Sequence, residues 1–231
     1  MIRIKGLNQA YGGTQILWDL DLDIAPGSIT CIMGRNGVGK TTLLKCLMGL
    51  LATRSGEIVI NGIDYTHKTA ESRARNGLGY VPQGRDIFPL LTVEENLRVA
   101  LGSRRDRSRK IPERIFDLFP VLKEMLSRRG GDLSGGQQQQ LAIGRALVLD
   151  PKVLILDEPN EGIQPNIVKQ IGDVVLKLNA DEGLTVVLVE QKLTFARRVG
   201  EAFRLMEKGR VVAAGAMSEL SEDLIAQHLA V

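Results

Sequence analysis

Cysteine is scarce in this sequence, and the placement of its two copies argues against two kinds of site. Cys31 and Cys46 both lie in apolar segments, and neither belongs to a CxxC pair or a histidine cluster. We therefore expect two small core residues in a reducing compartment. Neither a disulfide framework nor a zinc site is predicted.

Long apolar runs and a large excess of charge are also missing. No run approaches the roughly 18 to 20 residues that span a bilayer, and residues 1–5 lack the apolar region of a signal peptide. The net charge of +3 is too small to indicate nucleic acid or an anionic membrane by itself. The basic stretch 103–110 contains no aromatic residue, so we predict a solvated loop and no nucleic-acid partner. Any membrane-spanning part of the machinery would belong to a partner chain.

The apolar pattern of the 231 residues predicts a layered α/β core. Within residues 16–24, apolar and acidic side chains alternate from Leu17 on, which indicates a half-buried strand. Residues 29–33 predict a buried strand. Residues 153–156 and 185–189 are continuous apolar runs, which are typical of central parallel strands covered on both faces. Helical patterns separate these runs, and one of them passes through Leu43, Leu44, Leu47 and Leu50.

The middle of the chain, from about Leu90 to Leu149, shows helical patterns only. Residues 92–95 form a capping box that opens a first helix. Residues 112–123 predict a second helix, and Ser134 caps a third that runs to Leu149. This block predicts a helical lobe inserted between two strand-rich halves.

A glycine-rich loop follows the strand at 29–33 and matches the phosphate-binding pattern GxxxxGK[ST]. It comprises Gly34, Arg35, Asn36, Gly37, Val38, Gly39, Lys40, Thr41 and Thr42. Glycines let backbone N–H groups converge on a phosphate, and the helix that follows adds its positive N-terminal end. Lys40 supplies a charge for the β- and γ-phosphates, and the Thr41 hydroxyl can ligate Mg²⁺.

Two acidic residues at the end of another buried strand complete this site. Asp157 and Glu158 follow the run at 153–156, at the carboxyl end where α/β sheets bind ligands. Asp157 can hold the metal through water, and Glu158 can polarise a water for attack on the γ-phosphate. Together the two motifs indicate a P-loop nucleoside triphosphatase, a class that includes GTPases, kinases, helicases and transport ATPases.

A second glycine-rich helix start narrows the class. Its residues, which follow Leu133, are Ser134, Gly135, Gly136 and Gln137. They present bare backbone N–H groups at the positive end of a helix and so form a second anion site. Because Lys40 already has its own loop, the simplest arrangement is a twofold dimer. Each subunit's second site would then close over the nucleotide of the other subunit.

With these motifs the sequence resembles the ABC ATPase family over its whole length. The resemblance implies ATP and Mg²⁺ as ligands, and a P-loop (RecA-like) α/β core with a small N-terminal antiparallel β region. It implies one ABC ATPase domain over residues 1–231, with a core lobe at 1–89 and 141–231. A helical subdomain that carries the second motif would occupy about 90–140.

The resemblance also assigns roles to two further residues. Tyr11 lies where the family stacks an aromatic ring on adenine. Gln83 matches the glutamine that touches the metal and the attacking water, and that links the core to the helical lobe. Gln83 is therefore expected both to ligate the metal and to take part in catalysis.

The chain departs from the family at three positions, and each carries a glutamine. Gln191 stands where the family has a histidine that contacts the γ-phosphate, and Gln164 and Gln140 stand where aspartate and arginine are common. Glutamine donates a neutral hydrogen bond but carries no charge, so Gln191 is predicted to assist catalysis while lowering turnover moderately. The only histidines, His67 and His228, are predicted to lie on the surface.

These departures resemble the branch of ATP-binding subunits that serves branched-chain amino-acid and amide uptake, and the motifs resemble the urea-uptake subunits most. The resemblance implies integral membrane permease subunits as partners and, indirectly, a periplasmic or extracellular substrate-binding protein. It places the chain in the cytoplasm, peripheral on the inner face of the plasma membrane. The dimer is either a homodimer or a heterodimer with a related ATP-binding subunit, and no residue is expected to contact the transported molecule.

Other functions stay open at this point. A non-transport ABC ATPase of DNA repair or translation usually has tandem cassettes, coiled-coil insertions or strongly basic surfaces, whereas this chain has single motifs and a charge near neutral. A non-hydrolysing nucleotide sensor would fit the missing histidine but not the intact pair Asp157 and Glu158. Export uses the same motor chemistry as import, so physical reasoning from the sequence gives neither the direction nor the substrate.

Overall fold

The larger of two β-sheets forms the centre of the fold in the computed structural model, which describes residues 2–104 and 106–229. Its strand order is β10 (Arg210–Ala216), β9 (Ala202–Glu207), β3 (Ile29–Met33), β8 (Thr185–Val189), β7 (Val153–Asp157) and β6 (Leu78–Val81). All neighbours run parallel except β10, which is antiparallel to β9. Every residue of β3, β7 and β8 is buried, which confirms the predicted central strands.

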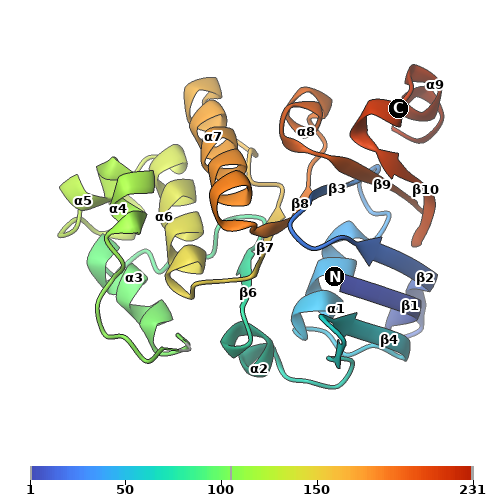
Figure 1. The fold of residues 1–231 in the computed structure, drawn as a ribbon, viewed down its shortest axis with the longest axis horizontal. Coiled ribbons are helices and arrows are strands. Elements are labelled where there is room, and N and C mark those ends of the chain that lie inside the picture. Colours follow the sequence, from blue (N-terminus) through green and yellow to red (C-terminus); the bar gives the residue numbers. More distant parts are fainter. Residues whose placement is uncertain (1, 105, 230–231) are drawn as a thin grey trace.

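The smaller sheet is antiparallel, with the strand order β2 (Thr14–Ile24), β1 (Ile2–Tyr11), β4 (Ser55–Ile60) and β5 (Ile63–Asp64). Helix α1 (Lys40–Met48) packs against this sheet and the larger one, and its apolar side chains share one core with both (Figure 1). Cys46 belongs to this core, and Cys31 to the core on the opposite face. Both thiols are buried and free, as predicted, and burial raises the pKa of each to about 12.

Helices cover the opposite face of the larger sheet and continue into a lobe beyond it (Figure 1). Those on the sheet are α6 (Gly135–Val148), α7 (Pro165–Glu182) and α8 (Leu193–Val199). The helices that contact α6 from the lobe are α3 (Val93–Leu101), α4 (Arg114–Leu118) and α5 (Pro120–Glu124). The remaining elements are α2 (Ala70–Arg75), α9 (Glu222–His228) and 3₁₀ turns at Gly130–Asp132 and Met217–Glu219. Among the described residues no strand lies between Leu90 and Leu149, as predicted.

The helical segment begins as the sequence predicts. Thr92 Oγ1 accepts from the N–H of Glu95 at 3.1 Å, and the Glu95 carboxylate accepts from the N–H of Thr92 at 2.7 Å. This is the expected capping box. The lobe boundary that we place near residue 140 falls inside α6, which runs unbroken, so the division into lobes stays a proposal.

The predicted single helix at 112–123 is wrong, because the structure breaks it at Phe119. Pro120 has no N–H and disfavours helical dihedrals in the residue before it. Phe119 accordingly has φ −134° and ψ 75°. The helix after the phosphate loop is also shorter than predicted, because Gly49 takes a left-handed conformation with φ 71° and caps α1. Leu50 therefore lies beyond the helix and is 56% exposed.

The alternation in β2 changes phase partway along the strand. Leu17 and Leu20 are both buried although they are three positions apart, and Trp18 between them is 45% exposed. Asp19 has φ 40°, and the register with β1 shifts at this point, which marks a β-bulge. A strict period of two would have placed Trp18 in the core with Leu20.

The basic stretch 103–110 is not fully solvated, contrary to the prediction. The Arg104 side chain is 11% exposed and donates to the Val148 carbonyl at the end of α6 at 2.9 Å. Cations are favourable at a helix C-terminus, where carbonyls lack helical partners. Arg104 also hydrogen-bonds Asp106 and thereby holds the pKa of that carboxyl well below its ordinary value. Arg105 lies outside the described residues.

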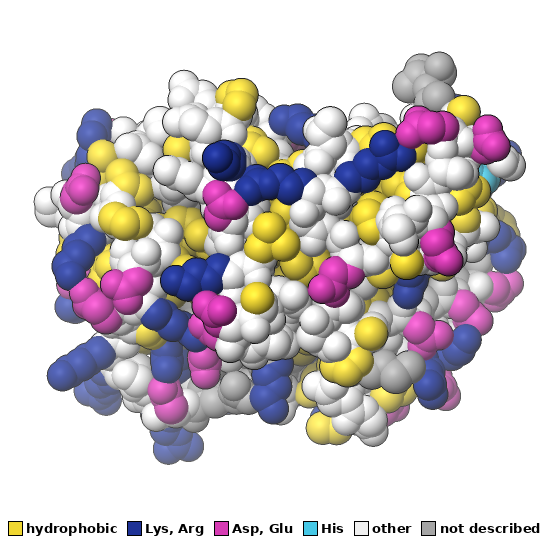
Figure 2. Space-filling model, turned by 45° about the horizontal axis from the view of Figure 1, so that its top comes forward, with side chains coloured by type: hydrophobic (Ala, Val, Ile, Leu, Met, Phe, Trp, Pro, Cys, Tyr) yellow, Lys and Arg dark blue, Asp and Glu magenta, His cyan; other side chains and the backbone are white. Residues whose placement is uncertain are grey.

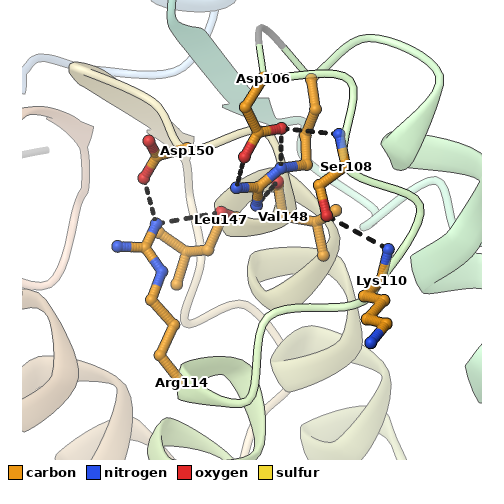
Figure 3. A network of polar contacts seen from close by, with 8 residues as sticks. Asp106, Ser108, Lys110, Arg114, Leu147, Val148 and Asp150 are labelled. Carbon is orange, nitrogen blue, oxygen red and sulfur yellow. Dashed lines mark hydrogen bonds and ion pairs between the residues drawn. The ribbon is translucent and has the colours of Figure 1, made fainter.

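A second arginine binds the same helix end (Figure 3). Arg114, at the start of α4, donates to the Leu147 carbonyl at 3.3 Å and pairs with Asp150 at 2.8 Å. Two cations from the helical lobe thus satisfy the last carbonyls of α6, the helix that joins the lobe to the core.

Charges of both signs are mixed on one face of the molecule. On the face shown in Figure 2, Lys and Arg side chains are interspersed with Asp and Glu, and hydrophobic side chains lie between them. In the part of the chain that the structure describes, no helix is both long enough and apolar enough to cross a membrane.

One arginine is completely buried and holds the far end of α1. Arg73 of α2 is 1% exposed. It donates to the carbonyls of Cys46 and Leu47, in the last turn of α1, at 2.9 and 2.8 Å. It also donates to three carbonyls of the segment 65–68, at 2.5, 3.3 and 3.0 Å. A single buried cation therefore joins α1 to the connection that follows β5.

Replacement of Arg73 by Met should lower the free energy of unfolding by about 3 kcal/mol, because it leaves buried carbonyls unsatisfied. Arg75→Met is the matched control, since Arg75 lies in the same helix and pairs with Glu71 at the surface. Its cost should stay below about 0.5 kcal/mol. Urea unfolding measures both variants, and equal losses would contradict the capping role of Arg73.

Candidate functional site

Four neighbouring parallel strands end at one edge of the larger sheet, and the loops after them carry most of the predicted site residues. β3 leads into the phosphate loop, β7 ends at Asp157, β8 precedes Gln191, and β6 precedes Gln83. Because these strands share one direction, their carboxyl ends lie at the same edge, which is where α/β folds bind ligands. The topology thus brings together residues that are far apart in the sequence.

A cavity of about 730 Å³ opens at this edge, a size typical of small-molecule sites. The predicted residues that line it are Asn36, Gly37, Gly39, Lys40, Thr41, Thr42, Gln83, Glu158 and Gln191. Four further residues line the cavity and were not predicted from the sequence: Ile16, Glu161, Glu190 and Lys192.

The phosphate loop leaves the start of α1 open. Gly39 precedes the helix with φ 105°, a conformation that favours glycine, and a Cβ there would lie 2.9 Å from a Leu17 methyl carbon. Within the described residues, no side chain caps the first N–H groups of α1, so these donors are available to an anion. Val38 does not line the cavity and packs against the core between the sheets.

Lys40 lies in the first turn of α1 and is 5% exposed. Its Nζ donates to the carbonyls of Gly34 and Arg35 at 2.8 and 2.9 Å. Burial lowers the pKa of Lys40, and the carboxylates of Glu158 and Asp157 oppose that shift. A largely desolvated ammonium at this position attracts phosphate oxygens strongly. Gly34 and Arg35 themselves do not line the main cavity.

The carboxylate of Asp157 is the best candidate for a metal ligand. Asp157 is 1% exposed, and among the described residues neither of its oxygens accepts a well-formed hydrogen bond. Burial raises its pKa, while the nearby hydroxyl of Thr41 opposes the shift. A buried carboxylate whose neighbouring hydroxyls, Thr41 and Tyr80, make no well-formed hydrogen bond to it is costly. It fits a divalent cation such as Mg²⁺, for which the Thr41 hydroxyl offers a second oxygen.

Glu158 follows Asp157 in a strained conformation and faces Gln191. Its φ of 49° lies in the left-handed region, which a non-glycine residue keeps only where its surroundings impose it. Gln191 Nε2 donates to Glu158 Oε1 at 2.6 Å and to Asn36 Oδ1 at 2.8 Å. One amide thus bridges the phosphate loop and the acidic residue, which are predicted to act on the same nucleotide.

Glu190, which is not among the predicted site residues, holds Gln191 in place from the cavity wall. It is 3% exposed, and its carboxylate accepts from the N–H groups of Gln191 and Lys192 at 2.9 and 2.8 Å. Asn160 Nδ2 donates to it at 2.5 Å. Burial raises the pKa of Glu190, and these hydrogen bonds oppose the rise. The available signal was its position directly after a buried apolar strand, like that of Asp157 after β7.

Gln83 is exposed at the rim of the cavity. Its Nε2 donates to Glu161 Oε2 at 3.0 Å. Glu161 belongs to the loop that follows Glu158, so Gln83 contacts the segment that carries the acidic pair.

The second predicted anion site forms a separate cavity of about 500 Å³. Ser134 Oγ accepts from the N–H of Gln137 at 3.4 Å, and Gln137 Oε1 accepts from the N–H of Ser134 at 2.9 Å. Gly135 and Gly136 also line this cavity, together with Gln140 and Gln164 among others. It shares no lining residue with the cavity at Lys40, so the structure does not bring the two predicted anion sites together within one chain.

Tyr11 and the two histidines lie outside both cavities. Tyr11 ends β1 and is 47% exposed, and Ile16 rather than Tyr11 lines the main cavity. His67 is exposed, as predicted. The prediction for His228 is wrong, because its side chain is only 9% exposed and its Nδ1 lies 3.0 Å from Glu207 Oε2. The contact of α9 with β9 covers this histidine, which sequence reasoning does not reveal.

Comparison with known proteins identifies the family. The family described as ABC transporter matches residues 17–161. The "Probable branched-chain amino acid transport ATP-binding protein LivF" of Archaeoglobus fulgidus is 40% identical over 223 residues, which cover 96% of this chain and 94% of LivF. The "High-affinity branched-chain amino acid transport ATP-binding protein BraG" of Pseudomonas aeruginosa is 39% identical, over 92% of this chain and 91% of BraG.

A solved structure shows the same fold. The ATP-binding cassette MJ0796, in a dimeric post-hydrolysis state bound to ADP and Pi, has a TM-score of 0.84 at 28% identity. The match covers 94% of this chain and 99% of that one. The predicted α/β P-loop fold is therefore confirmed, and the chain belongs to the ABC transporter family as an ATP-binding subunit that couples ATP hydrolysis to transport.

Proposed function

We propose that two copies of this chain, or one copy and a related ATP-binding subunit, form a dimer that powers solute import. The observation that carries this proposal is that the cavities at Lys40 and Ser134 share no lining residue. A twofold dimer would let each Ser134 site close over the nucleotide held by the other subunit. The dimeric state of the MJ0796 cassette supports this arrangement.

In each composite site the phosphate loop, Gly34 to Thr42, would hold the phosphates of ATP. The open N-terminus of α1 and the buried ammonium of Lys40 supply the positive potential. Thr41, Asp157 and Gln83 would hold Mg²⁺, which neutralises charge on the transferred phosphoryl group. Tyr11 would stack on the adenine from the open side of the cavity.

Hydrolysis would depend mainly on Glu158. Its carboxylate lines the cavity near Lys40 and would polarise the attacking water. Gln191 would keep that carboxylate in place through its 2.6 Å hydrogen bond. Gln83, in the loop that leads from the core to the helical segment, would contact the same water and so report nucleotide occupancy to that segment.

Coupling to a permease would use the apolar segment that follows Gln83. Phe88 and Leu90 are 43% and 79% exposed, which is unusual for large apolar side chains and typical of an interaction site. If a helix of a membrane permease docked there, movement of Gln83 or of the helical lobe would displace that helix. The chain would then act at the inner face of the plasma membrane, with a substrate-binding protein on the opposite side.

The transported solute would be a branched-chain amino acid, a short amide or urea. LivF and BraG are named for branched-chain amino acid transport, and they support amino-acid import. Urea is the narrower proposal, and it rests on the resemblance of the motifs 34–40, 130–140 and 161–165. The net charge of +3 and the mixed charges on the face shown in Figure 2 give no support to a nucleic-acid partner.

Glu158→Gln should reduce steady-state ATP hydrolysis by at least about 10²-fold, because the amide cannot polarise water, and it should retain bound ATP. Lys40→Ala should abolish nucleotide binding. Phosphate release and binding of a fluorescent ATP analogue measure the two effects. With Mg²⁺ and ATP, Glu158→Gln should also elute as a dimer in size-exclusion chromatography. Hydrolysis at near-parental rates by Glu158→Gln would refute its assignment.

Gln191→His should add a titration step to the pH profile of kcat. The pKa of an imidazole is ordinarily about 6.5, and the neighbouring carboxylate of Glu158 would raise it. The inflection is therefore expected between about pH 6.5 and 8. Gln191→Asn is the control, because it keeps a neutral amide. Identical profiles for the His and Asn variants would show that position 191 does not act on the rate.

Reconstitution with the permease and binding-protein subunits should give ATP hydrolysis that the imported solute stimulates. Urea or a short amide should stimulate hydrolysis and accumulate inside vesicles that hold this chain and ATP in the lumen and the binding protein outside. Vesicles of inverted topology are the control and should not accumulate the solute. Stimulation by leucine alone would replace urea with a branched-chain amino acid. Import requires the solute to move from the compartment of the binding protein to the compartment of this chain. Movement in the opposite direction would contradict import.

A further inference from the structure

The loop after Gln83 holds an unusual run of left-handed residues. Gly84, Arg85 and Asp86 have φ values of 81°, 76° and 47°. Only the first is glycine, and non-glycine residues keep this conformation where surrounding contacts impose it. The contacts of Arg85 supply such a constraint.

The Arg85 guanidinium joins two segments that flank the catalytic cavity. Its Nη1 donates to Gln138 Oε1 of α6 at 3.1 Å, and its Nη2 donates to the Glu161 carbonyl at 3.3 Å. Gln83 already contacts the Glu161 side chain at 3.0 Å. The loop after β6 is thus hydrogen-bonded both to the loop after β7 and to the helix that Ser134 caps.

The receiving amide is itself oriented. Gln138 Nε2 donates to the carbonyls of Gly130 and Leu133 at 3.3 and 3.2 Å. Because these acceptors require the NH₂ group, the Oε1 atom must face Arg85, and an amide flip would lose every one of the contacts. The hydrogen bond therefore has a defined direction.

The backbone around Arg85 is shaped to admit the guanidinium. A Cβ on Gly135, the first residue of α6, would lie 3.3 Å from both Nη atoms, closer than most side chains tolerate. From the other side, Arg145 of α6 donates to the Asp86 carbonyl at 2.6 Å and lies over the Phe88 ring, 5.1 Å from its centre. The loop is held to α6 at two points, and Arg85 is the one that also reaches the Glu161 loop.

We propose that Arg85 is a positioning residue that makes the Ser134 end of α6 move together with Gln83 and the loop of Glu158. It touches the loops and the helix, not the nucleotide. One contact set would then transmit the state of the first cavity to the second, within the same chain. This inference rests on the proposed roles of Ser134 and Gln83.

The test uses Arg85→Gly in the full chain, because glycine accepts the left-handed backbone while the whole side chain, guanidinium included, is removed. Asp86→Gly is the matched control, since it makes the same backbone change at the next left-handed position and leaves Arg85 intact. Arg85→Gly should lower kcat roughly 10-fold, the typical worth of a hydrogen bond from a charged group. The ATP concentration for half-maximal rate, and binding of an ATP analogue to Glu158→Gln carrying the same change, should stay within about twofold.

A double-mutant cycle separates positioning from general loosening. Gln138→Ala should lower kcat as well, and Arg85→Gly with Gln138→Ala should be little worse than either alone. Arg85→Lys should recover part of the rate, because it restores a cation that reaches one acceptor. Additive losses, an equal loss in Asp86→Gly, or parental kcat in Arg85→Gly would overturn the proposal. If Glu158→Gln retains its rate, the proposed function fails instead, whatever Arg85→Gly does.

Discussion

Two opposite charges are buried at the edge where β3 and β7 end, and the rest of the site depends on them. Burial raises the pKa of Asp157 and lowers that of Lys40, so each group is destabilised in its charged form and each partly offsets the other. Within the described residues the Asp157 oxygens accept no well-formed hydrogen bond. The buried pair of Lys40 and Asp157 therefore favours a ligand that brings a phosphate for the ammonium and a divalent cation for the carboxylate.

The helix that carries Lys40 is prepared for that ligand by what happens at its two ends. At its N-terminus no described side chain caps the free N–H groups. At its C-terminus the buried guanidinium of Arg73 takes up the carbonyls of Cys46 and Leu47. The negative end of the helix is thus neutralised inside the protein and the positive end is left to the cavity. Because α1 packs between the two sheets, its positive end keeps a fixed position relative to Asp157.

The parts of the structure that sequence predicts well are those in which neighbouring residues decide the outcome. Apolar runs indicated the central strands, and glycine spacing indicated the phosphate loop and the start of α6. The predictions that are wrong or incomplete involve a local break in a pattern or a contact between residues far apart in the sequence. Pro120 splits a helix whose apolar pattern is continuous, and the bulge at Asp19 reverses the faces of β2. Glu190 becomes part of the site only because β8 lies beside β7 and β3.

Three glutamines, Gln140, Gln164 and Gln191, also owe their importance to distant contacts rather than to their neighbours in the sequence. Each stands where the family commonly has a charged or ionisable side chain, and each lies at a site that the proposed dimer would bring together. Gln191 bridges Glu158 and Asn36, whereas Gln140 and Gln164 line the cavity at Ser134. Neutral amides keep their hydrogen bonds at any physiological pH and tolerate burial without a counter-charge. The interface of this subunit would therefore rely on shape and hydrogen-bond direction more than on ion pairs, which makes the fixed orientation of loops such as that of Arg85 correspondingly important.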